Sequence, residues 1–248
     1  MSSRQKKVIF GVAGLFSFAC ALGVLAATGT QSWIKGTIFC QTGALLVNAS
    51  GQELEKFIGE IQYGLFSGER VRQCGLGGRP FQFSWKVKQR YSHSFPSLGS
   101  VFPDLLKVIP LSIHVSVILF SIILIVFTLV ATAFFLFNAF GKPYETLHGP
   151  TGLYFWSFIS CTCGCLVMVL FASEVKIHRL SEKIANYKEG TYIYLTHSEN
   201  YASSFWVIFV CSFVHFLNGF LIRLAGFQFP FAKSKDSETT NGAVDLMY

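Results

Sequence analysis

Long apolar stretches without a charged side chain dominate the pattern of this chain. Four occur, at Val8–Ile34, Val108–Gly141, Thr146–Ser173 and Asn200–Ile222. Each can cross about 30 Å of hydrocarbon, which takes roughly 20 helical residues. A helix is expected for each, because it satisfies its own backbone hydrogen bonds inside lipid. The pattern predicts transmembrane helices over residues 8–28, 108–138, 152–173 and 204–226.

The composition favours a membrane protein over a soluble fold. Hydrophobic residues make up 52% of the chain and charged residues 13%, against roughly 25% charged residues in an average soluble domain. We therefore expect the lipid bilayer to solvate much of the surface. The net charge of +7 is dispersed through the loops. This distribution suits a membrane surface, and we expect no nucleic-acid partner.

The first apolar stretch has a second interpretation, as a cleaved signal peptide. Arg4, Lys6 and Lys7 precede it, and a cleavage site near Ala26 and Ala27 would fit. The apolar core Val8–Leu25 is longer than the usual signal core of about 7–15 residues. We therefore favour a retained helix.

Charges next to the spans predict the orientation. Basic residues flank the first span at Arg4, Lys6 and Lys7 and the last span at Arg223, which places both ends in the cytosol. The predicted layout is a cytosolic N-terminus (1–7), a large extracellular loop (29–107), a cytosolic loop (139–151), a second extracellular loop (174–203) and a cytosolic tail (227–248).

The loops carry signals of local structure. Trp33–Cys40 and Thr191–Thr196 are typical of extended strands. Ser50 and Glu53 match a helix capping box, and apolar residues follow at helical spacing at Leu54, Phe57, Ile58 and Ile61. The third helix is expected to continue beyond the membrane, because one helical face stays apolar at Ile177, Leu180 and Ile184.

The first loop contains two candidate modification sites. Asn48-Ala49-Ser50 is a sequon for N-linked glycosylation at Asn48. Cys40 and Cys74 are the cysteines outside the predicted spans, and an oxidising compartment favours a disulfide between them. Two free thiols, or pairing with another chain, are the alternatives.

Polar and small residues inside the spans are interpreted as helix-packing groups. Ala13, Ser17 and Ala21 recur every four residues and form a small-residue seam. His215 and Asn218 share one face of the fourth span and are expected to bond another helix, through Thr128 or Thr132. No Asp, Glu, Lys or Arg lies deep in a span, which argues against a transporter or pump.

The remaining chemistry is sparse. Cys161, Cys163 and Cys165 resemble a metal motif, but thiols two residues apart point in opposite directions on a helix, so we expect no metal and no cofactor. No catalytic constellation is found, and we expect no enzyme. Leu246 and Tyr248 at the C-terminus form a candidate ligand for PDZ proteins.

The layout resembles the claudin-like group of four-span proteins. Trp33, Gly64-Leu65-Phe66, Cys40 and Cys74 occupy positions similar to landmarks of that group, although Phe66 replaces the usual tryptophan. The resemblance implies an all-α membrane protein, a four-helix transmembrane bundle with a small extracellular β-sheet.

A more extensive resemblance identifies the chain as similar to the clarin family, most of all to its founding member. The stretches that carry it are Phe16–Gly23, Lys35–Glu53, Tyr144–Pro150, Ala172–Ile177 and Phe227–Lys235. One difference is Trp85–Ser100, which is longer and more basic than the usual loop of the family.

The resemblance implies a role in hair cells and photoreceptors, in stereocilia and synaptic regions, supporting hearing, balance and vision. We expect a multi-pass protein of the plasma membrane that reaches it through the ER and Golgi. The favoured interpretation is a non-enzymatic organiser that links other membrane proteins to a submembrane actin scaffold. The alternative is an auxiliary subunit that controls the trafficking or gating of an ion channel. A channel or transporter in its own right is a third interpretation, which the lack of a polar path disfavours.

The first prediction concerns membrane insertion and the sugar. The protein is expected to stay in membranes through carbonate washing, and a glycosidase should reduce its apparent mass. Asn48→Gln and Ser50→Ala should abolish the glycosidase shift, whereas Ser50→Thr keeps the sequon and should retain it. Extraction by carbonate, or a site at Asn48 reachable only from the cytosol, would contradict the predicted topology.

Overall fold

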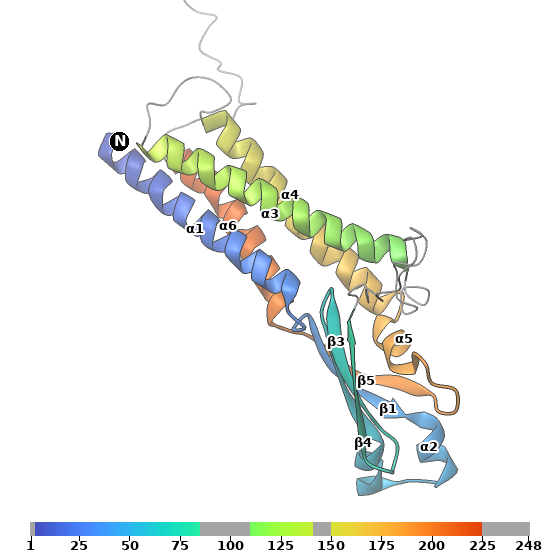
Figure 1. Ribbon diagram of the computed structural model, residues 1–248. Coiled ribbons are helices and arrows are strands. Elements are labelled where there is room, and N and C mark those ends of the chain that lie inside the picture. The colour runs from blue at the N-terminus through green and yellow to red at the C-terminus, as the bar shows by residue number, and fades with distance from the viewer. Residues whose placement is uncertain (1–2, 85–109, 141–149, 225–248) are drawn as a thin grey trace, which may run out of the picture.

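Four long helices form a bundle in the part of the chain that the structure describes. The computed structural model describes residues 3–84, 110–140 and 150–224 (Figure 1). The long helices are α1 (Ser3–Gly29), α3 (Leu111–Phe140), α4 (Pro150–Lys176) and α6 (Ser203–Leu224). Helix α1 packs against α3 and α6, and α4 packs against the same two helices. All four are long and apolar enough to cross a membrane, which confirms the predicted fold class.

The outward faces of these helices require an apolar solvent. Between 33% and 39% of the residues in the most apolar window of each helix are buried inside the protein. Large hydrophobic side chains such as Leu15, Phe158 and Phe216 point outward, each with more than half of its surface exposed. Lipid is the solvent that fits such a surface.

The second part of the fold is an antiparallel sheet at one end of the bundle (Figure 1). Among the described residues its five strands are β1 (Ile34–Cys40), β2 (Ile58–Tyr63), β3 (Ser67–Gln73), β4 (Gly78–Ser84) and β5 (Tyr194–Tyr201). Their order is β4-β3-β2-β1-β5, so the strand before α6 pairs with the strand that follows α1. Three short helices accompany them: α2 (Gln41–Leu46), the 3-10 helix η1 (Gly51–Phe57) and α5 (Leu180–Asn186). We call residues 34–84 and 180–201 the sheet domain.

Alternation along the strands gives the sheet two different faces. Ile34, Ile38, Ile61 and Tyr63 are buried on one face. The opposite face carries the polar row Asn200, Lys35, Gln62, Glu69 and Gln82, one residue from each strand. This pattern of one buried and one solvated face is typical of antiparallel sheets.

The predicted continuation of the third helix is wrong. Helix α4 ends at Lys176, and Arg179 adopts a left-handed conformation with a φ of 48° before α5 begins at Leu180. Leu180 and Ile184 are buried as the pattern indicated, but Ile177 is 74% exposed in the break. The helical spacing of apolar residues therefore continues in the sequence across Arg179, although the helix itself is broken there.

The predicted capping box is also absent. Ser50 precedes the 3-10 helix η1, and its side chain makes no capping hydrogen bond. Ile58 and Ile61 lie in β2 rather than on a helix, since pairing with β1 and β3 overrides their helical spacing. The strand expected at Thr191–Thr196 begins later, at Tyr194, and continues to Tyr201.

Helices α4 and α6 pack closely at Gly164. A Cβ atom at this position would overlap the hydroxyl of Ser212 and lie 3.2 Å from the Ser212 Cβ. Ser212 is itself buried, and its hydroxyl donates to the carbonyl of Ile208 in its own helix. A side chain at position 164 would therefore force Ser212 to move, and a small residue here suits close helix packing.

Gly164→Val is therefore expected to lower the free energy of unfolding by about 1–3 kcal/mol, the usual cost of overpacking a core. Thermal unfolding of the purified protein in detergent measures the effect. The matched control is Gly219→Val in α6, because a Cβ there has no neighbour within 4 Å. Equal melting temperatures for the two variants would contradict the assigned helix contact.

Candidate functional site

The junction between the bundle and the sheet domain is built around Trp33, the residue before β1. Its side chain is fully buried, and its indole N–H donates to the Ala27 carbonyl of α1 over 2.7 Å. The ring meets Phe171 of α4 edge-on, with 4.8 Å between the centroids. Its backbone carbonyl accepts from Ala202, the residue before α6. Trp33 thus contacts three of the four long helices or their connections.

A second junction contact joins His114 of α3 to Glu174 of α4. The His114 Nδ1 atom lies 2.9 Å and 3.2 Å from the two carboxylate oxygens of Glu174. Its Nε2 atom lies 3.0 Å from the Leu65 carbonyl in the turn between β2 and β3. The two side chains are only 3% and 0% exposed, so water does not screen the interaction.

The geometry restricts where the protons of this pair reside. A carbonyl oxygen only accepts, so Nε2 of His114 must carry a hydrogen that it donates to Leu65. An ionised carboxylate also only accepts, so Nδ1 must then carry a second hydrogen. His114 and Glu174 therefore form an imidazolium–carboxylate pair or its neutral tautomer. Each form needs both partners, because removing one leaves the other buried with an unpaired charge or an unmade hydrogen bond.

Two arginines of β3 fasten the sheet to α5. Arg70, which is 2% exposed, donates to the carbonyls of Ile184, Ala185 and Tyr187 at the end of that helix. Arg72 donates to the carbonyls of Ala185 and Tyr187 and pairs with Glu189 over 2.6 Å. Burial and the neighbouring Arg72 charge lower the pKa of Arg70 to about 10. Arg70 consequently stays charged at neutral pH.

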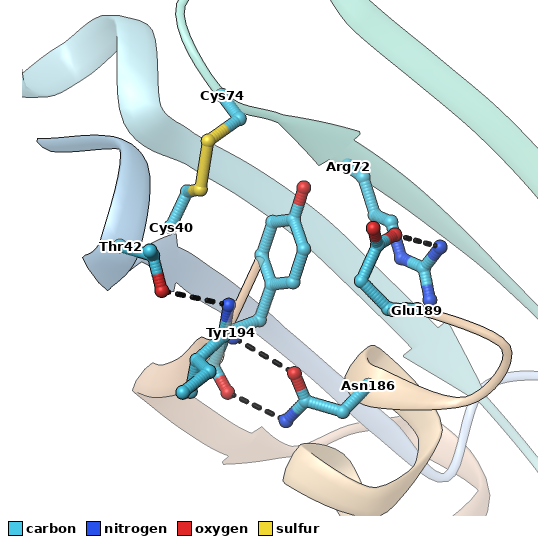
Figure 2. Close-up of a disulfide and its surroundings, with 8 residues drawn as sticks. Cys40, Thr42, Arg72, Cys74, Asn186, Glu189 and Tyr194 are labelled. Carbon is cyan, nitrogen blue, oxygen red and sulfur yellow. Dashed lines mark hydrogen bonds and ion pairs between the residues drawn. A yellow bond between two sulfur atoms is a disulfide. The ribbon is translucent and has the colours of Figure 1, made fainter. Parts of the chain in front are cut away.

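Further contacts brace the end of the sheet domain that lies away from the bundle (Figure 2). A disulfide joins Cys40 at the end of β1 to Cys74 after β3, with 5.5 Å between the Cα atoms. The Asn186 side chain accepts from the backbone N–H of Tyr194 and donates to its carbonyl, both over 2.8 Å. Thr42 accepts from the backbone N–H of Ile193 over 3.0 Å. The disulfide thus closes the first loop on itself, and the Thr42 hydrogen bond joins that loop to the second.

Asn48 lies at the same end of the sheet domain, in the turn after α2. Its backbone is left-handed, with a φ of 51°, and the residue is exposed. Leu45, Leu46 and Val47 before it are also more than 60% exposed. A sugar at this position would meet no steric obstacle from the described residues.

The predicted packing residues lie inside the bundle. Ala13, Ser17 and Ala21 are buried, and the Ser17 hydroxyl accepts from Thr132 of α3 over 3.0 Å. His215 of α6 contacts Thr128 of α3, with 3.2 Å between Nε2 and Oγ1. Asn218 is buried on the same side of α6, but its amide nitrogen has no hydrogen-bond partner among the described residues.

The other predicted features contribute no chemical site to the part of the chain that the structure describes. Cys161, Cys163 and Cys165 are free thiols, and no group of His, Cys, Asp and Glu in that part could hold a metal ion. The candidate PDZ ligand at Leu246 and Tyr248 and the long loop segment Trp85–Ser100 lie outside the described residues.

Sequence reasoning missed the residues that hold the β2–β3 turn to the bundle and those that hold β3 to α5. His114, Glu174, Arg70 and Arg72 attracted no attention, because their partners are 49 to 117 residues away in the chain. A weak signal existed for two of them. His114 is a polar group near the start of the second apolar stretch, and Glu174 is the first charge after the third.

The architecture defines a four-span membrane protein that carries a sheet domain built from both of its loops on one side. The family model described as Clarin-2-like matches residues 5–222. Clarin-1 of Homo sapiens is 73% identical over 248 residues, and clarin-1 of Rattus norvegicus is 70% identical over the same length, with 100% of each chain covered. Clarin-2 of Homo sapiens is 36% identical over 243 residues, 98% of each chain. The chain therefore belongs to the clarin family, as the sequence resemblance predicted.

The buried pair at the junction gives a direct prediction. Glu174→Ala is expected to lower the free energy of unfolding by about 3–5 kcal/mol, because it leaves the buried His114 without its partner. Denaturant unfolding in detergent measures this change, and limited proteolysis reports whether the sheet domain loosens.

The control is Lys176→Gln, which breaks an exposed ion pair two residues further along. Lys176 is 57% exposed and contacts Glu199 over 2.8 Å, and such surface pairs contribute at most about 1 kcal/mol. If Glu174→Ala and Lys176→Gln destabilise the protein equally, the junction pair has no special role.

Proposed function

We propose that this clarin is a non-enzymatic membrane organiser of hair cells and photoreceptors. The bundle anchors it in the plasma membrane, and the sheet domain faces the extracellular space and contacts partner membrane proteins. The cytosolic tail couples the complex to the submembrane actin scaffold of stereocilia and synaptic regions. The clarin resemblance supports this cellular setting, in which the protein would contribute to hearing, balance and vision.

One observation carries the proposal: the sheet domain is fixed to the bundle by contacts that form no reaction centre. Trp33 bonds α1, and the pair His114–Glu174 bonds the turn at Leu65. Arg70 and Arg72 bond α5 and keep the sheet domain itself rigid. A fixed domain loses little conformational freedom when it binds a partner, and this preorganisation raises affinity. Such rigidity suits a scaffold that holds other proteins at defined positions.

The interior of the bundle also supports this role. Ser17, Thr128, Thr132 and His215 bond one another across α1, α3 and α6. These bonds engage the polar groups in helix packing, whereas transport needs polar groups along a path for the substrate. The outward apolar faces remain free to meet lipid or the helices of partner proteins.

Crosslinking in native sensory tissue tests the proposal. Lysine-directed crosslinking and mass spectrometry should join Lys35 and Lys56 of the sheet domain to extracellular parts of other membrane proteins. Actin-scaffold proteins should co-purify through the tail. The matched control is a truncated chain without residues 225–248. It should lose the actin-scaffold proteins and keep the crosslinks of the sheet domain.

Three results would change the assignment. If deletion of the protein alters the currents of a channel that co-purifies with it, the auxiliary-subunit interpretation is correct. If the purified protein alone conducts ions in liposomes, the organiser interpretation fails. Recovery of the protein without any crosslinked partner would also contradict it.

A further inference from the structure

A small cavity lies beside the disulfide, at the end of the sheet domain away from the bundle. Its volume is about 250 Å³, and its lining comes from β3, β4, the turn between them and the segment between α5 and β5. Arg72, Arg79, Phe81, Tyr192 and Tyr194 form much of the wall.

The wall of this cavity carries more positive than negative charge. Arg72 and Arg79 are directly opposite each other on β3 and β4, and like charges in that position destabilise a sheet. Glu189 is the carboxylate in the lining, and Arg72 holds it at 2.6 Å. Arg79 is exposed and forms no ion pair with another described residue. One guanidinium thus faces the cavity without a counter-charge.

The two arginines differ in how freely they can bind a ligand. Arg72 already donates to two carbonyls and one carboxylate, so it forms a fixed wall. Arg79 retains its donors for an incoming group. Burial and Glu189 raise the pKa of the Tyr194 phenol, while the charges of Arg72 and Arg79 act in the opposite direction, which is consistent with both cations lying near this ring.

The rim of the cavity adds exposed apolar groups to this charge. Leu76 is 83% exposed and Phe81 is 40% exposed, on either side of Arg79 in the sequence. Arginine, tyrosine and large apolar side chains at one place are typical of the centre of a protein interface. The disulfide at Cys74 and the bonds of Arg72 keep the wall in place, so binding would require little ordering.

We infer that this cavity binds an acidic side chain, flanked by apolar residues, from the extracellular part of a partner protein. The carboxylate pairs with Arg79, and the apolar neighbours pack on Leu76 and Phe81. Tyr192 and Tyr194 close the other side. The inference rests on the proposed function, because it gives a chemical identity to the surface through which the sheet domain recruits a partner.

Peptide binding to the full chain in nanodiscs tests the inference. The probe is the acetylated and amidated pentapeptide Gly-Phe-Glu-Phe-Gly, and its affinity is measured by interferometry. Replacing its Glu by Gln should weaken binding about tenfold, the effect of losing one charge-assisted hydrogen bond. Arg79→Gln in the protein should weaken binding of the Glu peptide by the same factor, and should leave the Gln peptide unaffected.

The matched control is Lys35→Gln, which removes another exposed cation, from the polar face of the sheet. It should leave the affinity unchanged. Thermal unfolding of each variant confirms that the sheet domain remains folded. Three results would overturn the inference: no binding of the Glu peptide, equal losses for the two variants, or binding of a heparin-derived tetrasaccharide in place of the peptide.

The outcomes separate this inference from the proposed function. If crosslinking in tissue recovers partners but Arg79→Gln leaves both the partners and the peptide affinity unchanged, only the cavity assignment fails. If no partner is recovered although the peptide binds as expected, the cavity is real and the organiser role fails.

Discussion

The sheet domain can act as one unit with the helices only because buried contacts fix it to them. Trp33, His114 and Glu174 lie where α1, α3 and α4 meet the sheet, and all three are buried. The His114 ring connects two helices and the β2–β3 turn with hydrogen bonds from its two nitrogens. Polar contacts in such an environment are strong when complete and costly when one partner is missing. The orientation of the sheet domain therefore depends on this small group.

The helix bundle and the sheet domain are stabilised differently, because lipid surrounds the bundle and water surrounds the sheet domain. In the bundle, hydroxyls and the His215 imidazole bond neighbouring helices, while the outward side chains are apolar. In the sheet domain, arginines bond the carbonyls at the end of α5, and a disulfide closes the far end. Lipid favours the hydroxyl and imidazole bonds between the helices, since an unsatisfied polar group in hydrocarbon costs free energy. A small sheet in water needs the arginine bonds and the disulfide, because its own hydrophobic core is small.

The parts of this fold that depend on chain length and local composition could be predicted from the sequence. A span needs a long charge-free stretch, and the four stretches correspond to α1, α3, α4 and α6. Cys40 and Cys74, predicted as partners from their compartment, are joined in the structure. Local patterns misled where tertiary contacts prevailed, as at Ile58 and Ile61, which follow helical spacing but pair in β2.

The residues at the junction could not be predicted, because their meaning depends on distant partners. His114 and Glu174 are 60 residues apart, and Arg72 meets Ala185 across 113 residues. A single histidine in an apolar stretch can have several structural roles, and no neighbouring residue in the sequence indicates which role His114 has. The break between α4 and α5 is similarly hidden, since Arg179 takes a left-handed conformation without a glycine or proline to indicate it.

The distance between the two ends of the molecule tests the fixed orientation most directly. Spin labels introduced through unnatural amino acids at Leu76 and Phe140 would report it by pulsed electron resonance in nanodiscs. Both sites are highly exposed, at 83% and 82%, and they lie in the β3–β4 turn and at the end of α3. A sheet domain fixed to the bundle predicts a single narrow distance distribution. A broad or multiple distribution in the unmodified protein would contradict the account.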